Sequence, residues 1–188
     1  MFIRLFGLLE DRLLYYIETF DIEVYFEKLI KDNCRTVYHR TQGLTKEKYQ
    51  AWVPLNGDQA YDFIIELLDQ KKKVLSKLFF GHEIKDNRID YNNRYFKAME
   101  TAFKRLIDII DFIRDKHLKM KTVNEFEALV KSFAADLVYF FSKKVARKWY
   151  LHLLVNHIPD MLRRHGSILK FSCGPQERVN GIHSRYIH

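Results

Sequence analysis

The stretch YFKAMETAFKRLIDIIDFIRDKH, residues 95–117, decides the fold class. Its spacing of apolar residues, three and four positions apart, places them on one side of an α-helix. A half-buried strand needs alternation with a period of two, which this stretch does not have. We therefore expect a long amphipathic helix whose buried face is formed by Phe96, Met99, Ala102, Phe103, Leu106, Ile109, Ile110 and Ile113.

Residues 56–81, NGDQAYDFIIELLDQKKKVLSKLFFG, repeat this helical pattern. Asn56 can cap the N-terminus together with Gln59, because the two residues have the spacing of a capping box. Gly81 follows the last apolar residue and is typical of a helix end. We expect one helix here, with the triplet Lys71–Lys73 on its solvated face.

The remaining segments complete a helical chain. Residues 122–145 begin with a second capping-box pair, Thr122 and Glu125, and residues 1–30 predict one or two further helices. Glycine and proline are scarce, which argues against a sandwich or barrel. SILKFSC, residues 167–173, is the one candidate strand. The fold class is therefore mainly α: a bundle of five to seven helices over residues 1–165, followed by a loop and a short helix.

The net charge of +8 is concentrated near the C-terminus, where residues 141–188 carry nine Lys or Arg against Asp160 and Glu177. Such asymmetry predicts an anionic partner, and DNA is the partner we expect. The alternative is a basic face that only meets solvent. The candidate nucleic-acid contacts in this quarter are Arg163, Arg164, Lys170, Arg178 and Arg185.

Cysteine usage and hydropathy indicate the compartment. Two cysteines, Cys34 and Cys173, do not form a disulfide framework, and their scarcity fits a reducing environment. The first residues contain Arg4 and Glu10 within their apolar run, which excludes a signal peptide or a membrane span there. We expect a soluble intracellular protein that does not enter a membrane.

The stretch HLLVNHIPDMLRRHGSI, residues 152–168, contains the candidate metal ligands His152 and His157. Residues five apart on an α-helix lie about 140° around its axis, so the pair shares a face only if the helix is distorted. Pro159 supplies a cause of distortion. The two histidines are either zinc ligands or polar partners in a packed interface. Glu177 is either a residue of a helix N-terminus or a carboxylate that binds metal.

The run H-x4-H-I-P-D-M-L-x-R-x-G-S-I, residues 152–168, continues into F-S-C-G-P-Q-E-x-x-N, which ends at Asn180. Over residues 149–186 it resembles the C-terminal catalytic segment of Transib-type DDE transposases, and equally that of the RAG recombinase catalytic subunit. The resemblance implies that His152 and His157 belong to a structural zinc site. It also implies that Glu177 is the last acid of a DDE triad that binds Mg²⁺ on an RNase H-like core in a nuclear DNA recombinase.

The chain departs from that pattern. The family completes its zinc site with a Cys-x2-Cys pair that is absent here, and Cys34 with His39 is the one substitute. The family carries its first two acids on β-strands, and most of that β-core is missing. We therefore expect a transposase-derived fragment, with an insertion-like helical region at 1–148 and a transposase-like segment at 149–188 in one compact unit. DNA cleavage and Mg²⁺ binding would need acids from a partner or a second copy.

Two other classes of function stay open. Arg147 and His152 have the spacing found in all-α HEPN-like ribonucleases, where histidine acts as acid and base and arginine stabilises phosphate charge. The third class is a non-catalytic helical module that binds DNA or a protein. Its support is the mixture of cations and aromatic residues at Lys143, Lys144, Arg147, Lys148, Trp149 and Tyr150.

Overall fold

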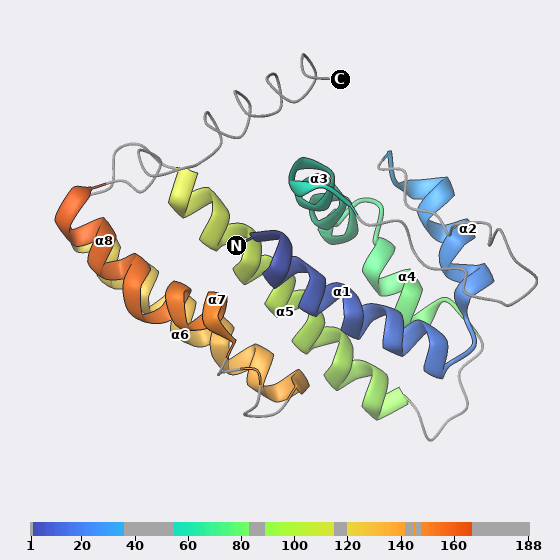
Figure 1. Ribbon diagram of the computed structural model, residues 1–188. Helices are drawn as coiled ribbons and strands as arrows, with labels where there is room; N and C mark the ends of the chain where they lie inside the picture. Colours follow the sequence, from blue (N-terminus) through green and yellow to red (C-terminus); the bar gives the residue numbers. More distant parts are fainter. Residues whose placement is uncertain are drawn as a thin grey trace, which may run out of the picture.

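The computed structural model describes residues 2–35, 55–82, 89–114, 120–141, 145 and 148–166, and in these residues every regular element is a helix. The mainly α fold class is therefore confirmed. The predicted strand at 167–173 lies outside the described residues. The helices, shown in Figure 1, are α1 (Phe2–Thr19), α2 (Glu23–Asn33), α3 (Gly57–Leu68), α4 (Val74–Phe80), α5 (Ile89–Arg114), α6 (Met120–Phe141), and the continuous run α7 (Trp149–His152), η3 (Leu153–His157) and α8 (Ile158–His165).

Helix α5 lies at the centre of the bundle and packs against α1, α3, α4 and α6. The predicted apolar face is the buried one: Met99, Phe103 and Leu106 are fully buried. Phe96 and Ile113, at the two ends of that face, are only half-buried but pack against the core. Among the described helices none is long and apolar enough to cross a membrane.

The two predicted capping boxes have different outcomes. At the start of α3, the Asn56 side chain accepts the Gln59 backbone N–H at 2.9 Å, and the Gln59 side chain accepts the Asn56 N–H at 3.0 Å. This box is confirmed. Helix α6 instead begins at Met120, so Thr122 lies inside its first turn. The predicted cap formed by Thr122 and Glu125 is therefore wrong, because the helix starts before it.

The helix predicted over residues 56–81 is two helices. Asp69 takes an extended backbone conformation after α3, and its Oδ1 accepts hydrogen bonds from the N–H groups of Lys71 and Lys72. Bonds of this kind compete with the helical pattern. Lys73 then has a positive φ of 52° at the start of α4. The lysine triplet lies in this turn and not on a solvated helix face, as the sequence had predicted.

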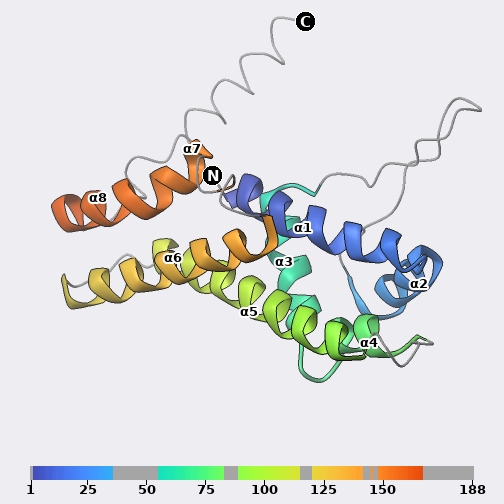
Figure 2. The same ribbon diagram turned by 90° about the horizontal axis from the view of Figure 1, so that it is seen from below.

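Polar contacts connect α6 to α1 and α5. The Arg105 guanidinium on α5 donates to both carboxylate oxygens of Asp136 on α6, at 2.6 Å each. Arg12 on α1 donates to the Phe140 carbonyl on α6, and its own carbonyl accepts the Tyr95 hydroxyl from α5 at 3.1 Å. The run α7–η3–α8 lies along α6, as both views show (Figure 2). The C-terminal run is therefore connected to the core through α6.

Gly81 should be required at the end of α4. A Cβ built there would lie 2.2 Å from the Tyr25 hydroxyl, which donates to the Lys77 carbonyl at 3.0 Å. We expect Gly81→Ala to lower the free energy of unfolding by about 1–2 kcal/mol, measured by urea denaturation.

The matched control for this substitution is Gly7→Ala inside α1, where a Cβ would meet no atom within 4 Å. That change should raise stability by about 0.5–1 kcal/mol, because alanine is the better helix former. Removing the Tyr25 hydroxyl in a Tyr25→Phe background should recover part of the Gly81→Ala loss. If Gly81→Ala is as stabilising as Gly7→Ala, the steric argument is wrong.

Candidate metal centre

A π-helical turn, η3, separates α7 from α8 and has a local cause. Pro159 has no N–H, and in an α-helix its ring would clash with the carbonyl of Val155, four residues before it. The chain instead adopts the i→i+5 pattern, in which the Ile158 N–H bonds the Leu153 carbonyl. In that pattern one turn takes in one more residue, and such turns recur at functional sites.

The π turn brings His152 and His157 onto one face. Their Nε2 atoms lie 3.1 Å apart and their ring centroids 5.0 Å apart, with the rings nearly perpendicular. Both side chains are exposed. A regular α-helix would have kept them about 140° apart around its axis. The helical distortion that the spacing of the two histidines requires is therefore present, and both side chains face solvent in the described structure.

Asn156 is a further polar side chain on this face. Its Nδ2 lies 3.0 Å from His152 Nδ1 and 3.1 Å from the His152 carbonyl oxygen. Asn156 was not predicted from the sequence, although its position four after His152 is the spacing that places two side chains together on a helix. Histidine ligands in metal sites depend on the partner of their second ring nitrogen, so Asn156 belongs to the candidate site.

Arg163, a predicted nucleic-acid contact, is used inside the protein. Its guanidinium donates to Glu127 on α6, to Asn124 on α6 at 3.3 Å and to Asp160 on α8 at 3.0 Å. The bonds from Lys131 and Arg163 lower the pKa of Glu127 to about 2. Nothing in the sequence indicates this link, because Glu127 and Arg163 are 36 residues apart. Arg163 therefore holds α8 on α6.

Other predicted site residues fall in different places. Arg164 is exposed on α8, the neighbour of the internally bonded Arg163. Lys148 and Trp149, where α7 begins, are also exposed, and Trp149 retains 68% of its accessible surface. Tyr150 is buried, and the remaining candidates lie outside the described residues; these are Lys143, Lys144, Arg147, Lys170, Glu177, Arg178 and Arg185.

Cys34 is a poor substitute for the missing cysteine pair. It lies at the end of α2, where burial and the nearby Glu66 carboxylate raise the pKa of its thiol to about 12. A thiol that keeps its proton is a weak metal ligand. His39 lies outside the described residues. In the described part of the chain, no group of three or more His, Cys, Asp or Glu side chains could hold a metal ion.

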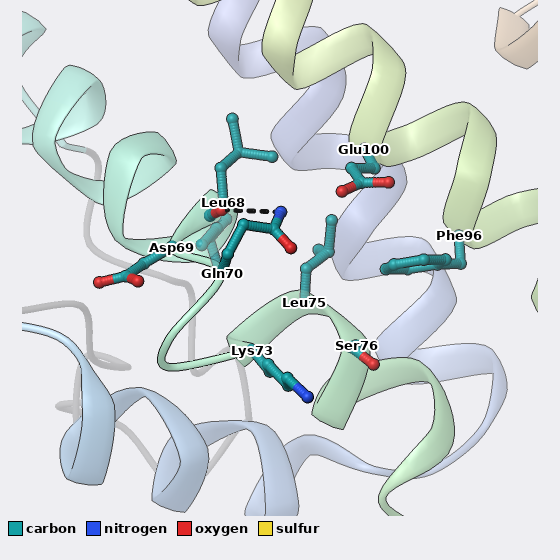
Figure 3. A pocket seen from close by; sticks show the side chains of 9 residues that line it. Leu68, Asp69, Gln70, Lys73, Leu75, Ser76, Phe96 and Glu100 are labelled. Carbon is teal, nitrogen blue, oxygen red and sulfur yellow. Dashed lines mark hydrogen bonds between the residues drawn. The ribbon is translucent and has the colours of Figure 1, made fainter.

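A pocket of about 340 Å³ lies between the α3–α4 turn and α5, away from the histidines. Figure 3 shows the Gln70 amide bonded to the Leu68 carbonyl, with Phe96 and Glu100 entering from α5. Glu100 pairs with Lys104 at 2.8 Å. Asp69, Gln70 and Glu100 are engaged in local hydrogen bonds or ion pairs, and no candidate site residue predicted from the sequence lines the pocket. The pocket therefore has no clear ligand chemistry.

Comparison with known proteins identifies no relative: no family description, curated protein or solved structure matches this chain. The arrangement of residues at the C-terminal run is therefore the main basis for assigning a function.

The link between Glu127 and Arg163 should make the docking of α8 depend on pH. The pKa of Glu127 is depressed from 4.5 to about 2, so its contribution to stability is complete above pH 4.5 and is lost as the pH falls toward 2. We expect Glu127→Gln to flatten the fall in thermal midpoint between pH 5 and 2. Glu125→Gln, a neighbouring exposed acid on α6, is the control. Equal pH profiles for wild type and Glu127→Gln would contradict this.

Proposed function

We propose that this chain is a recombinase-derived, DNA-binding helical protein whose C-terminal run holds zinc through His152 and His157. The observation that supports the proposal best is the convergence of the two Nε2 atoms at 3.1 Å on a π turn. Both rings face solvent, so a metal ion can reach them. The proposal agrees with the role that the resemblance to Transib-type transposases implies for these histidines.

The two rings suit zinc in their spacing. Zinc binds imidazole nitrogen at about 2.0–2.1 Å in tetrahedral geometry, which separates two ligand atoms by about 3.3 Å. The observed 3.1 Å is close to that value. Zinc bound at both rings would connect the two ends of the π turn and so stabilise a distorted stretch of helix. A structural zinc has four ligands, and two of them must come from outside this pair.

The basic C-terminal quarter is the proposed DNA-binding part. It carries +7 of the net charge of +8, and Arg164 presents its side chain to solvent beside the zinc-binding face. Each lysine or arginine that contacts a phosphate releases a counterion, so binding of this kind needs no base sequence. In this proposal Glu177 keeps an inherited Mg²⁺-ligand position. The chain does not cleave DNA by itself, and it acts in the nucleus.

A second candidate function is the non-catalytic binding module. The exposed Trp149, directly after the exposed Lys148, favours it. An exposed indole beside a cation is suited to a base and its phosphate, or to the surface of a protein partner. This function needs neither zinc nor Glu177, so zinc binding separates the two candidates.

Zinc binding should depend on both histidines. Titrated with ZnCl₂ in a calorimeter, the metal-free chain should bind zinc, and His152→Ala and His157→Ala should each weaken binding at least tenfold, because each removes a ligand. His165→Ala, a third histidine of the same helical run, should bind as wild type does. Zinc binding that survives both ligand substitutions would refute the proposed site.

DNA binding should distinguish the two adjacent arginines. In fluorescence anisotropy with a labelled duplex, affinity should fall steeply with salt, and Arg164→Gln should reduce the slope of log affinity against log salt by about 0.9. Arg163→Gln should leave that slope unchanged and lower the thermal midpoint, because it breaks the link to Glu127. Undetectable binding at low salt would mean that the basic face only meets solvent, and equal slopes for wild type and Arg164→Gln would remove Arg164 from the proposed DNA contacts.

A further inference from the structure

Asn156 has an orientation that its two contacts determine. The side-chain atom that faces the His152 carbonyl oxygen at 3.1 Å must be the NH₂ group, because an amide oxygen there would face another acceptor. The same Nδ2 lies 3.0 Å from His152 Nδ1. One NH₂ group has two hydrogens, so it can donate to both atoms at once.

This contact selects the tautomer of His152. A ring nitrogen that accepts a hydrogen bond carries no proton, so in the neutral ring the proton is on Nε2. His152 Nε2–H then donates to His157 Nε2 across the 3.1 Å between them. The proton therefore occupies the position from which Nε2 would bind a metal.

We propose that Asn156 is a positioning residue that holds His152 in the tautomer unable to bind metal through Nε2, and so weakens zinc binding by the pair. This inference rests on the zinc site proposed above. For zinc to bind, the ring must move its proton from Nε2 to Nδ1. Nδ1–H then faces the NH₂ group of Asn156, which places two donors in contact. The amide must therefore turn away and lose its hydrogen bonds to His152 Nδ1 and to the His152 carbonyl oxygen. In metal sites, the second ring nitrogen of a ligating histidine more often faces a carboxylate or carbonyl oxygen.

The test is zinc affinity in Asn156→Ala and Asn156→Leu, measured by calorimetry on the full chain. Both remove the NH₂ group, and leucine keeps the branched shape of the asparagine side chain. Because Asn156 is exposed and its bonds compete with water, we expect zinc to bind about 2- to 10-fold more tightly in each variant. The matched control is Asn33→Ala, since Asn33 on α2 likewise donates to the carbonyl of the residue four positions before it, Leu29, at 2.8 Å.

A second readout is the tautomer itself, seen in long-range proton–nitrogen correlation spectra of the metal-free chain. His152 in the wild type should be protonated on Nε2. Protonation on Nδ1, or equal zinc affinity in wild type and both Asn156 variants, would overturn the role of Asn156 while leaving the zinc site intact. Absence of zinc binding in the wild type and in every variant would instead refute the zinc site and this inference with it.

Discussion

Burial of the apolar face of α5 is the interaction on which the rest of the structure depends. Met99, Phe103 and Leu106 are fully buried, and each side chain of this kind contributes about 1.5–3 kcal/mol when removed from water. Four other helices pack around that face. One of them, α6, also carries the C-terminal run, because Arg163 bonds Glu127. The candidate metal site is thus held, through α6, by the core around α5.

The π turn determines which polar side chains lie together on the C-terminal run. Pro159 would disrupt the hydrogen bonds of a continuous α-helix at its position. The backbone instead forms a π turn, which contains one more residue than an α-helical turn. That change rotates His157 onto the face that His152 and Asn156, four residues apart, already share. A local defect in helical hydrogen bonding therefore produces a cluster of ring nitrogens that a regular helix would have dispersed around its axis.

Charge on the C-terminal run has two uses. Arg163 is drawn into a network with Glu127 and Asp160, where it stabilises the docking of α8. Arg164, one residue later, projects to solvent and keeps its charge available to an anion. Neighbouring arginines on a helix point in directions about 100° apart, so only one of them can face α6. The formal charge of this quarter therefore overstates the charge that a DNA backbone would meet there.

The sequence by itself determined the helical class, the buried face of α5 and the cap at Asn56, because each depends on residues a few positions apart along one helix. The sequence also predicted His152 and His157 as candidate metal ligands, and Pro159 as the cause of the helical distortion that their spacing requires. Only the tertiary structure decided that the pair is exposed, that Arg163 is bonded to a residue 36 positions away, and that Asp69 divides the predicted helix of residues 56–81. Periodicity reports which face of a helix is apolar, but whether a charged or polar side chain meets water or a partner depends on which other helix packs beside it.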